Sequence, residues 1–316
     1  PVSVGAALPF GHRRDYGPLV PTTSLPPLPP SDLHVVRQPW PTLVSFARVL
    51  AHRPSPIDRA TVVRPHGVRV ESWAVGAGLP QRYRDVVGSG AEMPLAFPAL
   101  LVTRLFRDLM GAGGLPVSGM GLVHVGTSLW TWGRLDSSQP WQVSAWVDGG
   151  RHTRSGLEID LAGQCTAAGS TWTLLMPVLA RSRRAAGTEP SAVPGLPEPT
   201  DAWGAPIPLD VPRETGRAYA QVSGDWNPIH LHAATARPFG FRGAIAHGWW
   251  TVARALAALD VDETPSTGGR RLGVAYARPV PVPSRVDLQH HTDGDTAFLG
   301  HTSDGKPAFG GTLETT

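Results

Sequence analysis

The chain contains a single cysteine, Cys165, and no long uninterrupted run of apolar residues. One thiol excludes an intramolecular disulfide bond and suits a reducing compartment. No apolar stretch approaches the roughly 20 residues that are needed to cross a bilayer, and the first residues lack a charged start followed by an apolar core. We therefore expect a cytoplasmic protein without stable membrane insertion.

Several patterns of common binding sites are also missing. Aromatic and basic residues do not interleave as they do in nucleic-acid-binding proteins, and Gly119-Met120-Gly121 lacks the third glycine and the helix of a dinucleotide-binding loop. The net charge is only +3. Arginines gather at 181–184 and 270–271, which suits a phosphorylated ligand, although solvated surface charge explains each cluster equally well. We expect no nucleic-acid partner.

An acid and a base lie together on one predicted turn. Asp225 and His230 are the residue types best suited to proton transfer near neutral pH. Asn227-Pro228 marks a turn, so a helix over residues 213–222 should end near Gly224. The carboxylate, the amide of Asn227 and the imidazole would then face a common cavity.

A helix that is apolar on almost every side is predicted over residues 248–259, and such a helix must be buried. Strand-like segments with period-two patterning follow, such as residues 286–289, and Asp293-Gly294 and Asp304-Gly305 mark the turns between them. An α+β architecture, with a sheet wrapped around one central helix, is the expected result. The helix would begin at Gly248, where free backbone N–H groups at its positive end favour an oxyanion.

These residues resemble a known family. The stretch closely resembles the hydratase-2 signature of MaoC-like (R)-specific enoyl-thioester hydratases and dehydratases. The matching positions are Tyr219, Ser223-Gly224-Asp225, Asn227-Pro228, His230, Ala236, Gly240-Phe241 and Ala246-His247-Gly248.

The resemblance implies a hot-dog fold and reversible hydration of trans-2-enoyl thioesters, with coenzyme A or phosphopantetheine on acyl carrier protein as the carrier. It implies catalysis by Asp225 and His230, with Asn227 orienting the carboxylate and the backbone N–H of Gly248 stabilising the enolate-like state. No metal and no further cofactor are implied. On the substrate side we predict Phe241, Ala246, His247, Trp249 and Trp250, although two tryptophans stand where the family commonly has flexible apolar residues.

The length calls for more than one such unit, because a hot-dog unit needs roughly 120 to 150 residues. We align residues 83–89 with residues 219–225, which sets Ser89 where the acid should be. The resemblance then implies a double hot-dog subgroup in which the first repeat has lost its catalytic residues and helps to house the acyl chain. The predicted segments are a proline-rich arm with a short helix near 42–50 (1–60), a degenerate repeat (61–184), a semi-extended linker (185–202) and a catalytic repeat (203–316).

Other functions are weighed against this one. Asp225, His230 and His232 form only a weak zinc pattern, and Ser223 lacks the Gly-x-Ser-x-Gly setting of a nucleophile. A thioesterase on this fold would need a carboxylate on the helix over residues 248–259, where none is found. A non-catalytic acyl-thioester-binding protein remains the alternative. A monomer or a homodimer of double hot-dog chains is expected.

Overall fold

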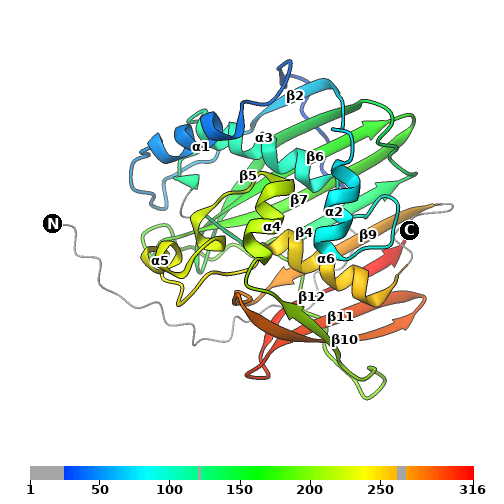
Figure 1. Ribbon diagram of the computed structural model, residues 1–316. Helices are drawn as coiled ribbons and strands as arrows, with labels where there is room; N and C mark the ends of the chain where they lie inside the picture. Colours follow the sequence, from blue (N-terminus) through cyan, green and yellow to red (C-terminus); the bar gives the residue numbers. More distant parts are fainter. Residues whose placement is uncertain (1–24, 120–121, 262–267) are drawn as a thin grey trace.

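The computed structural model describes residues 25–119, 122–261 and 268–316, and the strands found there join into one large sheet (Figure 1). The N-terminal half contributes β1 (His34–Val35), α1 (Thr42–Ala51), β2 (His66–Trp73), α2 (Leu79–Val87), α3 (Ala99–Gly111), β3 (Leu122–His124), β4 (Gly126–Trp132), β5 (Trp141–Thr153), β6 (Gly156–Ala167) and β7 (Ser170–Arg181).

The C-terminal half follows after a stretch without helix or strand. Its elements are β8 (Ile207–Val211), α4 (Thr215–Ser223), η2 (Pro228–His230), α5 (Ala233–Ala236), η3 (Arg237–Phe239), α6 (Gly248–Leu259), β9 (Gly269–Tyr276), β10 (Ser284–Asp293), β11 (Asp295–Thr302) and β12 (Pro307–Thr315). None of the described helices is both long enough and apolar enough to cross a membrane.

The two halves have the same strand order in the sheet. The first half runs β2-β5-β6-β7-β4, and the second runs β8-β10-β11-β12-β9 from the opposite edge. Their inner strands β4 and β9 pair antiparallel, so that the two sheets are continuous. Each half therefore passes from its outer strand, β2 or β8, through a helical segment to four further strands, with β3 as an addition in the first half. The boundaries predicted at 60, 184 and 202 stay predictions.

Each half packs its part of the sheet against one central helix, and the helices gather on one face of the sheet (Figure 1). Leu101 and Leu105 on α3, and Val252 and Leu256 on α6, belong to one continuous hydrophobic core. Burial of apolar surface, worth about 25 cal/mol per Å², is the dominant stabilising term for such an arrangement. Of the two central helices, α3 begins at Ala99, and α6 begins at Gly248 as predicted.

The short helix expected in the N-terminal segment is also present. α1 packs on α3, and Ser45 and Val49 are its buried residues. Just before it, β1 extends the sheet by pairing parallel with β2. The first 24 residues of the predicted proline-rich arm lie outside the described part of the chain.

The linker packs against the face of the sheet opposite the helices. The Glu158 carboxylate on β6 accepts hydrogen bonds from Oγ of Ser191 at 2.6 Å and from the backbone N–H of Ala192 at 2.8 Å. Val193 is buried in a separate small cluster that includes Leu179. Because neighbouring residues of a strand point to opposite faces, Leu179 faces the linker while Val178 faces the helix-side core. These contacts hold the segment, which has no helix or strand, to the sheet.

One tight contact between helix and sheet is directly testable. A Cβ placed on Gly163 of β6 would lie 2.2 Å from Cγ1 of Val102 on α3. We expect Gly163→Ala to lower the free energy of unfolding by about 1–3 kcal/mol through overpacking. Val102→Ala alone should cost a similar amount through the space it leaves.

The Gly163→Ala/Val102→Ala double variant should then be more stable than the sum of the single effects predicts, because the new methyl group fills the vacated space. Urea unfolding of the wild type and the three variants measures this coupling. Strictly additive losses would contradict the helix–sheet contact.

Candidate active site

The end of α4 aims Asp225 away from the helix. Gly224 adopts the left-handed conformation, with φ of 73°, and its N–H donates to the carbonyl of Ala220. Ser223 Oγ donates to the carbonyl of Tyr219 at 2.8 Å and accepts from the N–H of Asp225 at 3.1 Å. The expected stop near Gly224 is confirmed, and glycine is favoured there because the left-handed region is strained for residues with a Cβ.

The Asn227-Pro228 turn links the acid to the base. The backbone N–H of Asn227 donates to Oδ1 of Asp225 at 3.2 Å, and Oδ1 of Asn227 accepts from the N–H of Ile229 at 3.4 Å. Asn227 thereby caps η2, the short helix that carries His230. These contacts form with the backbone a few residues on, as is typical of asparagine and aspartate in turns.

His230 is fixed in one tautomer by the loop before α6. Its Nδ1 lies 2.8 Å from the carbonyl oxygen of Ile245, so Nδ1–H donates and Nε2 keeps its lone pair. The backbone of η2 lies against α4, since a Cβ on Gly216 would lie only 1.8 Å from the carbonyl oxygen of His230. The position of His230 therefore depends on a glycine 14 residues earlier.

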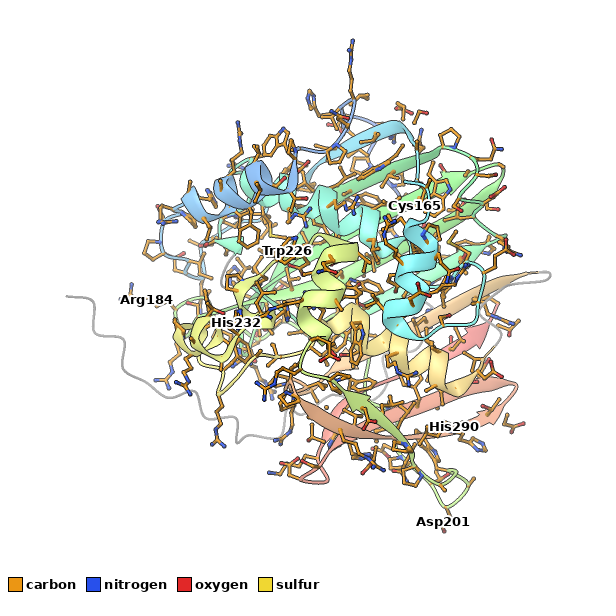
Figure 2. All side chains as sticks on the ribbon, viewed as in Figure 1. Cys165, Arg184, Asp201, Trp226, His232 and His290 are labelled. Carbon is orange, nitrogen blue, oxygen red and sulfur yellow. The ribbon has the colours of Figure 1, made fainter. Side chains whose placement is uncertain are left out.

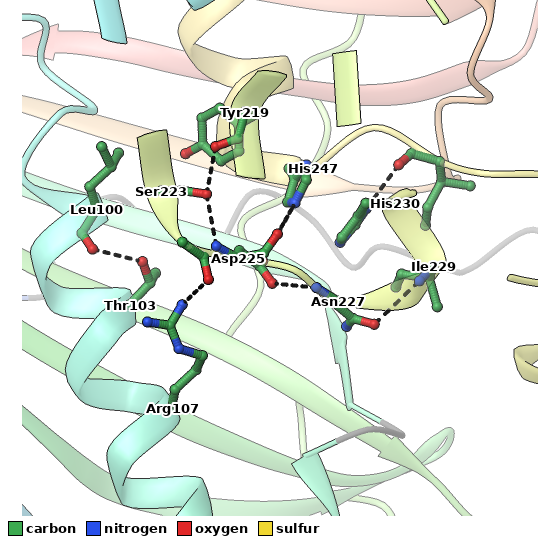
Figure 3. Close-up of polar contacts among 12 residues, drawn as sticks. Leu100, Thr103, Arg107, Tyr219, Ser223, Asp225, Asn227, Ile229, His230 and His247 are labelled. Carbon is green, nitrogen blue, oxygen red and sulfur yellow. Dashed lines mark hydrogen bonds and ion pairs between the residues drawn. The ribbon is translucent and has the colours of Figure 1, made fainter. Parts of the chain in front are cut away.

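A second imidazole completes the cluster (Figure 3). The His247 ring stacks on that of His230, with centroids 3.7 Å apart and planes at 25°. Its Nε2 lies 3.0 Å from the backbone oxygen of Asp225 and 3.8 Å from Oδ2 of the same residue. An acid and two histidines thus meet where the turn after α4 faces the start of α6.

The electrostatics favour an ionised carboxylate beside neutral imidazoles. Burial raises the pKa of Asp225, but electrostatic interactions with His247, His230 and the Arg107 guanidinium, together with the N–H of Asn227, outweigh it, and the pKa lies below its usual value. The Asp225 side chain is 41% exposed, and its accessible surface faces the cavity described below. The surrounding protein therefore still shifts its pKa. Burial lowers the pKa of His230, partly offset by Asp225 and by the carbonyl of Ile245. Burial and the adjacent His230 lower the pKa of His247 to about 3.

The cluster opens into a cavity of about 430 Å³. Residues predicted for the substrate side line it: Phe241, Ala246, His247 and Trp249. The residues predicted for catalysis line it too: Asp225, Asn227, His230 and Gly248. Trp250 is not among the lining residues. Its indole N–H donates to the carbonyl of Val86 at 3.0 Å, because the next residue of a helix is turned about 100° away. The structure thus brings one of the two tryptophans to the cavity and directs the other to α2.

The N-terminal half supplies much of the cavity wall. Apolar lining residues come from α1, α3, β3 and β7: Phe46, Val49, Phe106, Met110, Leu122, Val123, Met176 and Val178. The wall also contains His124 and Arg107, which the sequence analysis missed. His124 Nε2 lies 2.9 Å from the carbonyl oxygen of Gly126, and burial lowers its pKa to about 4. No local motif marks these residues, since they reach the site only through the tertiary fold.

Within the described residues, Asp225, His230 and His247 are also the group whose ligand atoms approach one another closely enough for a metal ion, all within 4.8 Å. His247 Nε2 already donates to a backbone oxygen, and the stacked rings lie nearly parallel. This geometry fits proton transfer better than convergent metal ligation. His232, the third residue of the weak zinc pattern, contacts Arg217 on the outside of the molecule near α5 (Figure 2).

Comparison with known proteins agrees with the fold and the motif. Residues 197–303 match the MaoC like domain family. 3-Hydroxyacyl-thioester dehydratase X of Mycobacterium tuberculosis is 28% identical over 234 residues, which span 72% of this chain and 80% of that protein.

Solved structures resemble the chain over most of its length. The crystal structure of HtdX from Mycobacterium tuberculosis has a TM-score of 0.67 at 23% identity, covering 79% of this chain and 100% of that one. A MaoC-like dehydratase from Phytophthora capsici has a TM-score of 0.68 at 14% identity, covering 82% and 98%. The predicted resemblance to MaoC-like dehydratases and the predicted double hot-dog fold are confirmed.

The contact between Gly216 and the backbone of His230 generates a prediction. Gly216→Ala should push η2 away, separate the stacked imidazoles and lower the free energy of unfolding by about 1–3 kcal/mol. The ring signals of His230 and His247 in NMR spectra, together with urea unfolding, report both effects. Gly243→Ala is the matched control, since a Cβ there would meet no atom within 4 Å. Unchanged ring signals in Gly216→Ala would refute the assigned packing.

Proposed function

We propose that this chain, which carries a MaoC-like domain in residues 197–303, catalyses the reversible hydration of trans-2-enoyl thioesters to (R)-3-hydroxyacyl thioesters. The observation that carries the proposal is that Asp225 and His230 line one cavity with their ligand atoms within 4.8 Å, while the Nδ1–H of His230 is engaged by the carbonyl of Ile245. The name of the relative from Mycobacterium tuberculosis supports the same reaction class, a hydro-lyase acting on acyl thioesters.

In the hydration direction, a water molecule held between Asp225 and His230 attacks Cβ of the enoyl group. Its proton passes to the basic member of the pair, and a proton from the pair is delivered to Cα, so that one water is added across the double bond. General acid–base catalysis of this kind typically contributes about 10²- to 10⁴-fold. The two groups interact closely and titrate as a coupled unit. Asn227 orients the carboxylate through its backbone N–H.

The start of α6 provides for the charge that develops on the thioester oxygen. Gly248 lines the cavity as the first residue of the helix, where backbone N–H groups have no partner within the helix. A Cβ on Gly248 would lie 3.0 Å from Nδ1 of His124 and 3.1 Å from Cζ of Tyr276, so a side chain would fill this space. The proposed role of the Gly248 N–H is to stabilise the enolate-like oxygen, as a preformed donor in a buried site can.

The apolar part of the cavity suits an acyl chain. Phe106, Met110 and Met176 line it, and methionine side chains adapt to irregular apolar partners. Coenzyme A and acyl carrier protein present the same phosphopantetheine thioester at the reacting end. Both are therefore proposed as carriers, and the assays below use both.

Substitution of the acid–base pair is the direct test of the reaction. Asp225→Asn and His230→Gln should each lower kcat by at least about a hundredfold while the thermal unfolding temperature stays near that of the wild type. His232→Gln, two residues from His230 and exposed, should keep wild-type turnover.

The assay is the loss of enoyl absorbance with crotonyl and longer trans-2-enoyl thioesters of each carrier. Wild-type-like turnover in Asp225→Asn or His230→Gln would refute the mechanism. If the wild type binds these thioesters without converting any of them, the alternative of a non-catalytic acyl-thioester-binding protein would hold instead.

The pH dependence follows from the lowered pKa of His230. The working state has His230 neutral and Asp225 ionised, and a histidine with a lowered pKa stays neutral further into acid than the ordinary value of 6.5. Hydration should therefore lose kcat/KM only when the pH falls below 6.5. A pH–rate profile between pH 4.5 and 8 checks this, and a decline that begins above 6.5 would contradict the assigned state.

A further inference from the structure

Two arginines of the N-terminal repeat donate hydrogen bonds to the end of the helix that leads to Asp225. Both lie on α3, one turn apart. Arg104 donates from Nη2 to the carbonyl of Val222 at 3.2 Å and from Nε to that of Ser223 at 3.4 Å. Arg107 donates from Nη1 to the carbonyl of Gly224, the residue directly before Asp225 (Figure 3). Three successive carbonyls at the end of α4 are thus held by the other repeat.

Arg107 is buried, with 8% of its surface exposed, and it lines the cavity. The adjacent Asp108 is hydrogen-bonded elsewhere, since it accepts from Oγ of Ser45 and from the backbone N–H of Trp40. Burial lowers the pKa of Arg107, and the charges of Asp225 and Asp108 oppose this effect. A buried guanidinium needs a partner, and Arg107 has the Gly224 carbonyl of the active-site turn, while the charges of Asp225 and Asp108 also act on it.

The corresponding turn of the first repeat also faces an arginine of the opposite central helix, without a catalytic acid. Gly88 ends α2 in the left-handed conformation, as Gly224 ends α4. A Cβ on Gly88 would lie 3.4 Å from Nη1 of Arg254 on α6, and a Cβ on Gly224 would lie 3.4 Å from Nη1 of Arg107 on α3. Each central helix therefore places an arginine next to the left-handed glycine of the other repeat.

The turns differ in the residue that follows the glycine. Ser89 follows Gly88, whereas Asp225 follows Gly224. A positive side chain near a helix C-terminus stabilises that helix in both repeats. Of Arg107 and Arg254, it is Arg107 that lies against the turn with the proposed acid.

We propose that Arg107 is a positioning residue for Asp225, and that the N-terminal repeat thereby completes the active site of the C-terminal repeat. This inference rests on the proposed hydratase function. The Nη1–H of Arg107 holds the Gly224 carbonyl, which fixes the direction in which the chain leaves α4, and its positive charge favours the ionised form of Asp225. Arg104 holds the carbonyls of Val222 and Ser223, the last residues of α4.

The test compares Arg107→Met with Arg254→Met. Both variants remove a guanidinium from equivalent turns, so a merely structural role would give similar losses in both. We expect Arg107→Met to lower kcat at saturating substrate about 10- to 100-fold, the scale for loss of a group that orients a catalytic residue. Arg254→Met should keep kcat near that of the wild type. Arg107→Lys retains the charge and should recover part of the loss.

A second readout does not depend on turnover. In protein labelled with ¹³C at aspartate carboxyl groups, with Asp225→Asn used for assignment, NMR follows the titration of Asp225. Removal of a nearby positive charge disfavours the carboxylate, so the Asp225 titration should move to higher pH in Arg107→Met. It should not move in Arg254→Met. Arg107→Lys replaces Arg107→Met if the latter does not fold, and a smaller upward shift is then expected.

The outcomes separate the two proposals. Equal kcat and equal Asp225 titration in Arg107→Met and Arg254→Met would overturn the positioning role while the wild type still hydrates its substrate. If the wild type hydrates no enoyl thioester, the proposed function fails. The titration shift then still decides whether Arg107 acts on Asp225.

Discussion

The antiparallel pairing of β4 with β9 is the contact on which the rest of the structure depends. It joins two sheets of equal strand order into one, and so sets the central helices of both repeats on the same face. The cavity is a product of this junction, because its walls come from α1, α3 and β7 of one repeat and from the turn after α4 and the start of α6 of the other. Neither repeat alone encloses the site.

Burial strongly affects the protonation states of Asp225, His230 and His247. Desolvation keeps His230 and His247 neutral, and their stacked rings disfavour a charge on either one. The nearby groups nevertheless hold the pKa of Asp225 low. The cluster thus sets an ionised carboxylate beside a neutral imidazole, and either group can take a proton from water and return it to the substrate.

Local signals made the turn predictable from sequence. Gly224 and Asn227-Pro228 carry their own backbone preferences, so the end of α4 and the approach of Asp225 to His230 follow from neighbouring residues. Long-range packing was not predictable in this way. Gly216 leaves room for η2, which packs back against α4. Arg107 reaches the turn after α4 from α3, an element of the other repeat. Trp249 and Trp250 look alike in sequence. The orientation of α6 in the fold turns Trp249 to the cavity and Trp250 to α2.

The central claim is that water is added across an enoyl thioester at this cavity. Its most direct test is hydration of crotonyl thioesters of coenzyme A and of acyl carrier protein in deuterium oxide, followed by chiral analysis and mass spectrometry of the product. The account predicts an (R)-3-hydroxyacyl thioester with one deuterium on Cα. An (S) product, or no product with either carrier, would contradict it.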